Sequence, residues 1–188
     1  MAAHRRTLSR GSEIDLFPLR PLTHTCRVAK EKLPVTPAIR VLRENKVPFV
    51  PFLYEYEERG GTAASAAALG VEEHVVVKTL VLEDDQHRPL ICLMHGDRQV
   101  STKKLARHLQ AKTVAPCSPA TAEKHSGYQV GGTSPFGTRH VMPVYLERSI
   151  LEVGPIYING GKRGFLVCVA PGDAARILAA ELVDVASP

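Results

Sequence analysis

Apolar and polar positions change their period several times along the chain, from the spacing of a helix to that of a strand and back. Thr36 and Pro37 are an N-cap residue and a proline at the first helical position, so they predict a short amphipathic helix that ends near Asn45. An alanine-rich run closed by Gly70 predicts a second helix. With three further segments that begin at Ser or Pro, the predicted helices cover residues 36–45, 62–69, 101–110, 118–126 and 171–182.

Short apolar runs between these helices predict the strands. They cover residues 50–56, 75–82, 89–94, 112–115, 141–146, 156–158 and 165–169. A short turn separates the second run from the third, and only antiparallel neighbours can be joined so closely. Because helices and strands are also interleaved, we predict a mixed α/β fold (α+β in part), in which a partly closed sheet or barrel of six to seven strands is surrounded by helices.

The organisation is that of one domain with an extension. Residues 1–33 show neither period and mix Arg, Ser, Pro and Thr, so we predict a flexible N-terminal extension followed by a single domain over residues 34–188. Residues 1–32 hold seven Lys and Arg against three Asp and Glu, whereas the rest of the chain holds 17 against 16. The domain is therefore nearly neutral and lacks the strongly positive field of a tight nucleic-acid binder.

The composition argues against several classes of protein. The uncharged stretches are far shorter than the roughly 20 apolar residues that span a bilayer, and Glu13 and Asp15 interrupt the basic N-terminus before any signal-like apolar region. We therefore expect a cytoplasmic protein that has no contact with a membrane. The four cysteines form no C-x-x-C pair and the eight histidines no close-spaced ligand pair, so we predict no disulfide, no metal site and no cofactor.

A lysine interrupts the apolar run over residues 75–82. Burying an unpaired ammonium group is costly, so Lys78 needs an anionic partner, a lowered pKa or a cleft to face. Taken alone, the pattern also fits a lysine that points outward from an edge strand.

Two glycine-rich segments are the other candidates for chemistry. The first, residues 127–137, contains four glycines and can present backbone N–H groups to a phosphate or to the oxyanion of an ester under attack, although such segments also occur as plain turns. The second runs from Tyr157 to Gly164, with paired glycines followed by Lys162 and Arg163. It is no P-loop, because a P-loop would need Gly at position 156 and Ser or Thr at position 163.

The order of these segments resembles the YbaK-type Cys-tRNA(Pro) deacylases, relatives of the editing insertion of bacterial prolyl-tRNA synthetases. The resemblance spans about residues 35–185 and rests on Thr36-Pro37-Ala38-Ile39, Tyr54, Lys78-Thr79-Leu80, Gly127-Tyr128 with Gly131-Gly132-x-Ser134-Pro135, and Gly160-Gly161-Lys162-Arg163-Gly164. It implies a mixed β-barrel surrounded by helices. It also implies a mischarged tRNA as substrate, release of the wrong amino acid, and prolyl-tRNA synthetase as a candidate partner. Oligomeric state stays open.

The resemblance further implies which residues form the site. The lysine that corresponds to Lys78 is essential in the family, and we assign it to the terminal-adenosine phosphate or the ester carbonyl. We assign the amides of Gly131 and Gly132 to the carbonyl oxygen. Tyr54 and Asn159 would orient the aminoacyl group. The remaining candidates for substrate binding are Thr133, Ser134, Gly160 and Gly161.

Two departures from the family leave the substrate open. Asn159 replaces a Ser of the best-known Cys-specific members, and Leu166 replaces an acidic residue of some members. The first hypothesis is a deacylase for Cys-tRNA(Pro), which also accepts Cys-tRNA(Cys). The alternatives are a deacylase for another small amino acid, such as Ala on tRNA(Pro), or a non-catalytic module that binds tRNA or a synthetase. The sequence contains no G-x-S-x-G elbow or Cys-His constellation, so we expect substrate-assisted cleavage without a protein nucleophile.

Overall fold

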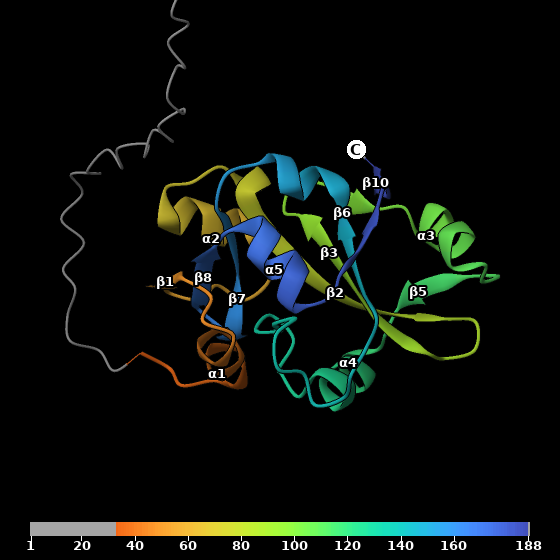
Figure 1. Cartoon of the computed structure of the whole chain (residues 1–188), viewed down its shortest axis with the longest axis horizontal. Coiled ribbons are helices and arrows are strands. Elements are labelled where there is room, and N and C mark those ends of the chain that lie inside the picture. The colour runs from red at the N-terminus through yellow and green to blue at the C-terminus, as the bar shows by residue number, and fades with distance from the viewer. Residues whose placement is uncertain (1–32, 188) are drawn as a thin grey trace, which may run out of the picture. The chain divides into compact units, whose positions relative to one another are not determined.

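The computed structural model describes residues 33–187 (Figure 1). The predicted N-terminal extension lies outside the described residues, except for Leu33. The helices are α1 (Pro37–Glu44), α2 (Gly61–Leu69), α3 (Thr102–Leu109), α4 (Pro119–Ser126) and α5 (Pro171–Ile177), with 3-10 turns η1 (Glu73–Val75) and η2 (Arg148–Glu152).

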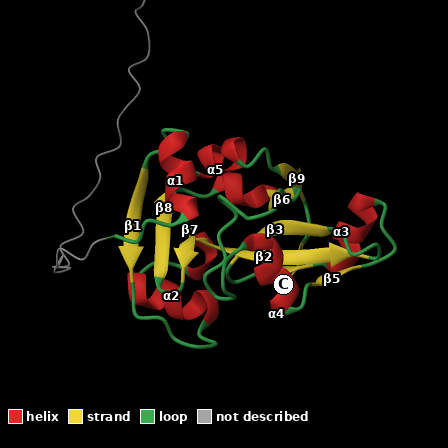
Figure 2. Ribbon diagram, turned by 90° about the horizontal axis from the view of Figure 1, so that it is seen from below, coloured by secondary structure: helices red, strands yellow, loops and turns green. Residues whose placement is uncertain are grey.

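An eight-stranded mixed sheet forms the centre of the fold. Seven of its strands follow the order β1-β8-β7-β2-β3-β6-β9, and β5 pairs with β2 beside this path. Figure 2 shows β1, β8 and β7 side by side, with β2 and β3 crossing them at a steep angle, so the sheet is strongly curled. The strands are β1 (Phe49–Leu53), β2 (Val76–Asp84), β3 (Pro89–His95), β5 (Val114–Pro116), β6 (Val144–Glu147), β7 (Ile156–Lys162), β8 (Phe165–Val169) and β9 (Glu181–Val183); β4 (Gln99–Val100) and β10 (Ala186–Ser187) form a separate ribbon.

The predicted mixed character of the sheet is confirmed. The hairpin β2–β3 is antiparallel, as expected from its short turn, whereas β2–β7, β3–β6 and β6–β9 are parallel pairs. On the side away from β3, β2 pairs with β7 only through Val76 and Val77, and with β5 only through residues 82–84. Within the described part of the chain, the middle of this edge, residues 78–81, therefore has no strand beside it.

Helix ends follow the capping chemistry read from the sequence. The side chains of Thr36, Ser101 and Ser118 accept hydrogen bonds from the first turns of α1, α3 and α4. Gly70 and Gly127 end α2 and α4 in the left-handed conformation that glycine adopts without strain.

The C-terminal part of the chain corrects the sequence-based expectation. The last helix was expected to reach residue 182, but α5 ends at Ile177, and Ala179 turns the chain with a φ of 46°. The next residues form β9, which pairs with β6 and buries Val183. Tertiary pairing thus outweighs the helical tendency of the alanines, and it adds a strand to the seven that were predicted.

Several other strands have different bounds from those predicted; β1, for example, ends at Leu53 rather than at residue 56. β6 begins at Val144 rather than at residue 141, and the side chain of Val141 is fully exposed. β7 continues through the glycine pair to Lys162, with a register shift against β8 between Asn159 and Lys162. The second glycine-rich segment is therefore a bulged strand and not a loop after a strand.

The main hydrophobic core lies between the sheet and the surrounding helices. Its fully buried members include Leu42 of α1, Leu93 of β3, Ile158 of β7 and Phe165 of β8. A second cluster joins β2 and β3 to Leu105 of α3. Among residues 33–187 no helix is long and apolar enough to cross a bilayer.

Candidate active site

A cavity of about 700 Å³ lies along the unpaired edge of β2. Residues 76–81 of that strand line it, together with residues of α2, α4, the first glycine-rich segment and β7. The gap between β7 and β5 therefore positions a pocket that is bounded by both the sheet and the helices. Five of the nine predicted site residues line this pocket: Tyr54, Lys78, Gly131, Thr133 and Asn159.

Lys78 lies half-buried in the wall of the cavity. Its Nζ atom donates a hydrogen bond of 3.0 Å to the carbonyl oxygen of Gly96. Burial lowers the pKa of the Lys78 ammonium group, while the charges of Glu73 and Asp97 act in the opposite direction. The lysine that interrupts the apolar run thus faces a cavity that also contains Tyr54 and Gly131.

Gly131 has a left-handed backbone and little space for a side chain. Its φ is 85°, and a Cβ atom placed on it would lie 2.5 Å from the hydroxyl oxygen of Tyr56. The guanidinium carbon of Arg163 lies 5.2 Å from the centre of the Tyr56 ring, and Arg163 Nε donates a hydrogen bond to the carbonyl of Val130. Both side chains line the cavity, and no local pattern in the sequence predicts that they meet.

Asn159 joins the two glycine-rich segments. Its Oδ1 atom accepts hydrogen bonds from the amides of Gly161 (2.7 Å) and Lys162 (3.2 Å). Its Nδ2 atom donates to the carbonyl of Gly131 at 3.3 Å. The side chain lines the pocket, and its polar atoms brace the bulge of β7 against the segment that carries Gly131.

Two other predicted site residues of the first segment, Gly132 and Ser134, support the fold. The amide of Gly132 donates to the carbonyl of Gln129 at 2.9 Å, so it is occupied by a turn rather than presented to an oxyanion. A Cβ atom on Gly132 would lie 2.7 Å from the backbone nitrogen of Arg163. Ser134 is fully buried, and its hydroxyl accepts a hydrogen bond from the amide of Phe136. Neither residue is among those that line the cavity.

The paired glycines of β7, Gly160 and Gly161, also support the fold rather than line the cavity. The carbonyl of Gly160 accepts a hydrogen bond from the Thr36 hydroxyl, which ties β7 to the start of α1. Gly161 has a φ of 91°, and a Cβ atom there would lie 2.7 Å from the ring of Tyr128. These glycines let the strand bulge and approach its neighbours closely, and they lie outside the set of cavity-lining residues.

Two weakly acidic groups in the wall of the cavity, the Cys117 thiol and the Tyr54 hydroxyl, remain protonated near neutral pH. Burial raises the pKa of the Cys117 thiol to about 11, with a smaller contribution from the charge of Glu83. Burial likewise raises the pKa of the Tyr54 hydroxyl. A thiol with so high a pKa is a poor nucleophile, whereas the phenol can still donate a hydrogen bond. Residues 33–187 contain no group of three or more His, Cys, Asp or Glu placed to hold a metal ion.

Solved structures share the fold of this chain. A candidate trans-editing enzyme for prolyl-tRNA synthetase superposes with a TM-score of 0.70 at 20% identity, over 82% of this chain and 100% of that chain. The hypothetical protein APE2540 superposes with a TM-score of 0.75 at 21% identity, over 81% of this chain and 100% of that one. At such identities the likeness shows the fold alone.

The chain belongs to the aminoacyl-tRNA editing domain family, which matches residues 57–177. EbsC of Enterococcus faecalis, a candidate Cys-tRNA(Pro)/Cys-tRNA(Cys) deacylase by name, is 31% identical over 137 residues, which are 72% of this chain and 84% of EbsC. A proline–tRNA ligase of Streptococcus suis is 32% identical over 100 residues, which are 53% of this chain and 16% of the ligase. The family inferred from the order of the motifs is thereby confirmed.

Proposed function

We propose that this protein is a trans-editing deacylase that removes a mischarged amino acid from tRNA. Its main substrate in this proposal is Cys-tRNA(Pro), and Cys-tRNA(Cys) is a second one. The observation that carries the proposal is the Lys78 ammonium group, half-buried in the cavity that Gly131 and Asn159 also line. The name of EbsC supports cysteine as the amino acid. The editing-domain family supports an aminoacyl-tRNA as the substrate.

In this proposal the cavity holds the aminoacyl end of the tRNA. The Lys78 ammonium group binds the terminal phosphate or the ester carbonyl, and the Gly131 segment stabilises the negative charge that develops on the carbonyl oxygen. Tyr54, which stays protonated, orients the aminoacyl group by donating a hydrogen bond. Asn159 acts mainly by holding the Gly131 segment in place, because both its amide oxygen and its amide nitrogen bind backbone groups.

The bond-breaking step needs no nucleophile from the protein. The thiol of the substrate cysteine attacks its own ester carbonyl, the C–S bond of a cyclic thiolactone forms, and the ester C–O bond to the ribose breaks. The thiol proton ends on the released ribose hydroxyl. An aminoacyl ester is already activated, so positioning and charge stabilisation carry the catalysis. The Cys117 thiol, which stays protonated, is consistent with a reaction in which the protein supplies no nucleophile.

Single-turnover deacylation of a panel of labelled aminoacyl-tRNAs tests the proposal. We expect the wild-type protein to release cysteine from Cys-tRNA(Pro) and Cys-tRNA(Cys) faster than the spontaneous rate, and to leave Pro-tRNA(Pro) intact. Faster release from Ala-tRNA(Pro) would make alanine the substrate instead. Protection of every ester, or no change in any of them, would identify a non-catalytic binding module and overturn the proposal.

A thiol-free analogue tests the chemical step separately. In 2-aminobutyryl-tRNA(Pro) a methyl group replaces the thiol, so the aminoacyl group has a similar size but carries no nucleophile. Substrate-assisted attack requires that this ester survive while Cys-tRNA(Pro) is cleaved. Cleavage of both at similar rates would show that a positioned water is the attacking group.

The nearly neutral domain is expected to select its tRNA weakly by itself. We propose that prolyl-tRNA synthetase, or competition with elongation factor, supplies part of the selection for tRNA(Pro). Adding the synthetase should then raise the preference for Cys-tRNA(Pro) over Cys-tRNA(Cys). Tight binding that is specific for tRNA(Pro) by the isolated protein would contradict this part of the proposal.

A further inference from the structure

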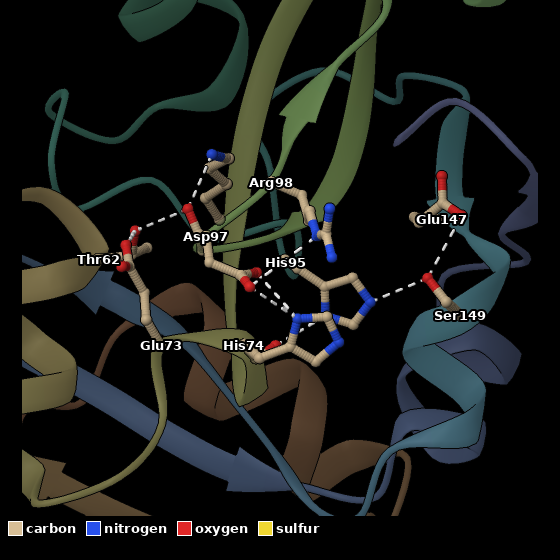
Figure 3. Close-up of polar contacts among 10 residues, drawn as sticks. Thr62, Glu73, His74, His95, Asp97, Arg98, Glu147 and Ser149 are labelled. Atoms are coloured by element: carbon tan, nitrogen blue, oxygen red, sulfur yellow. Dashed lines mark hydrogen bonds and ion pairs between the residues drawn. The ribbon is translucent and has the colours of Figure 1, made fainter. Parts of the chain in front are cut away.

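The acceptor of the Lys78 hydrogen bond belongs to a polar network outside the predicted site residues. Gly96 directly follows β3, and its carbonyl oxygen lies 3.0 Å from Lys78 Nζ and 3.3 Å from the hydroxyl of Thr62. The one proton of this hydroxyl is directed mainly to the carboxylate of Glu73, which lies at 2.7 Å. Figure 3 shows Thr62 and Glu73 on one side of Asp97, and the rings of His74 and His95 on its other side.

The position of Gly96 leaves no room for a side chain. A Cβ atom placed there would lie 2.7 Å from the carbonyl oxygen of Glu73 and 2.9 Å from Cβ of Thr62. The backbone of Gly96 does not adopt the left-handed conformation, so space rather than φ is what requires glycine here. Its amide donates a hydrogen bond of 2.7 Å to the carbonyl of Val76, which fixes it to β2 two residues before Lys78.

Both neighbours of Gly96 are anchored by their side chains. His95 is buried; its Nδ1 atom donates to the carbonyl of His74 at 2.7 Å, and its Nε2 atom lies 3.0 Å from the hydroxyl of Ser149. The ring of His74 stacks on that of His95 at 3.8 Å between centroids, and its Nδ1 atom lies 2.9 Å from Asp97 (Figure 3). The turn that carries the Gly96 carbonyl is therefore held from η1, from η2 and from β2.

The charges around the turn suit an ammonium group. Glu73 and Asp97 both favour the charged form of Lys78 and partly offset the cost of its burial. A fixed carbonyl dipole adds direction to this attraction, because a hydrogen bond constrains where the Nζ atom lies more tightly than charge alone.

We propose that Gly96 is a positioning residue for Lys78: its carbonyl, clamped through the bond of the Gly96 amide to Val76 and the anchored side chains of His95 and Asp97, holds the ammonium group at the point in the cavity where it meets the substrate. The residue would act through Lys78 and would touch no substrate atom itself. The inference rests on the proposed function for its catalytic consequence, whereas the clamp is a property of the folded protein and can be measured without substrate.

The test compares Gly96→Ala with Gly154→Ala. The control position has no atom within 4 Å of an added Cβ and no left-handed backbone. Protein labelled with ¹³C at the lysine ε carbons allows the Lys78 signal to be titrated by NMR, and Lys78→Met assigns that signal. We expect Gly96→Ala to lower the pKa of Lys78 further, because the charged form loses its acceptor, and to slow single-turnover deacylation by about 10- to 100-fold with little change in KM. Gly154→Ala should match the wild type in both measurements.

A second pair of variants keeps the test decisive if Gly96→Ala does not fold. Thr62→Val removes the hydroxyl that donates to Glu73 and lies 3.3 Å from the Gly96 carbonyl, and should shift the Lys78 titration in the same direction. Thr62→Ser keeps the hydroxyl and should restore most of the titration and of the rate. Folded Gly96→Ala, or folded Thr62→Val, with the wild-type Lys78 titration and rate would overturn the proposal. A wild-type protein that cleaves no aminoacyl-tRNA would instead overturn the proposed function, and the titrations would still decide on the clamp.

Discussion

Replacing Gly131 by alanine should damage the site more than the fold, and the structure gives the size of both effects. The left-handed φ of 85° costs an alanine about 1–2 kcal/mol. The new Cβ atom, 2.5 Å from the Tyr56 hydroxyl oxygen, forces that ring to move and weakens its contact with Arg163, for roughly another 0.5–1 kcal/mol. The free energy of unfolding should fall by about 2 kcal/mol, which lowers Tm by about 4–8 °C in a domain of this size.

A control variant separates the effect of Gly131→Ala on the pocket from the effect of backbone strain alone. Gly70 also has a left-handed φ, but an added Cβ meets nothing within 4 Å and the residue lies at the end of α2, away from the cavity lining. Gly70→Ala should therefore lose stability and keep its single-turnover rate. Gly131→Ala should lose about 10- to 100-fold in rate, because Tyr56, Asn159 and the oxyanion contact shift together. Equal rates in the two variants would refute the role given to the Gly131 segment.

Three further outcomes follow from the same contacts. Cys117→Ala should keep the single-turnover rate within about twofold, since a thiol of pKa about 11 is protonated at neutral pH, and a loss of about 100-fold would reveal a protein nucleophile. Asp84→Asn should lower the unfolding free energy at pH 7 by about 1–3 kcal/mol in urea denaturation, because the carboxylate accepts hydrogen bonds from Gln86 and Arg88. Although burial acts to raise the pKa of Asp84, these bonds and the Arg88 charge hold it below its ordinary value. The stability that the carboxylate contributes is therefore present above its unfolded-state pKa and disappears as pH falls through its folded-state pKa. A difference in unfolding free energy between wild type and variant that stays constant down to pH 2 would contradict the assignment. Asn159→Ser should slow deacylation about tenfold, because a serine hydroxyl is too short to reach both glycine-rich segments, and an unchanged rate would remove Asn159 from the site.

Local chemistry made much of the fold predictable from the sequence. Capping residues such as Thr36 and Ser118 act on their own first turn, so the starts of α1 and α4 could be placed without knowing any partner. The hairpin β2–β3 is equally local. Lys78 could be singled out because a charge in an apolar run is anomalous wherever the run lies.

The features that were missed depend on contacts between distant parts of the chain. The segment after α5 is a strand only because β6 offers an edge to residues 181–183, and no local pattern shows that. The contact of Arg163 with Tyr56 and the hydrogen bond of Lys78 to Gly96 likewise arise only once β2, β3 and β7 are assembled. Glycines were the hardest residues to interpret, since Gly131 lines the pocket whereas Gly132 packs against Arg163.

The central claim is that the Lys78 ammonium group acts on an aminoacyl ester held in this cavity. Single-turnover deacylation of labelled Cys-tRNA(Pro) by the wild type and by Lys78→Met, with thermal unfolding of both, tests it most directly. We expect the variant to lose at least about 100-fold in rate and to unfold at the same or a higher temperature, because a half-buried ammonium group is replaced by an apolar side chain. A folded Lys78→Met protein that releases cysteine at the wild-type rate would contradict the claim.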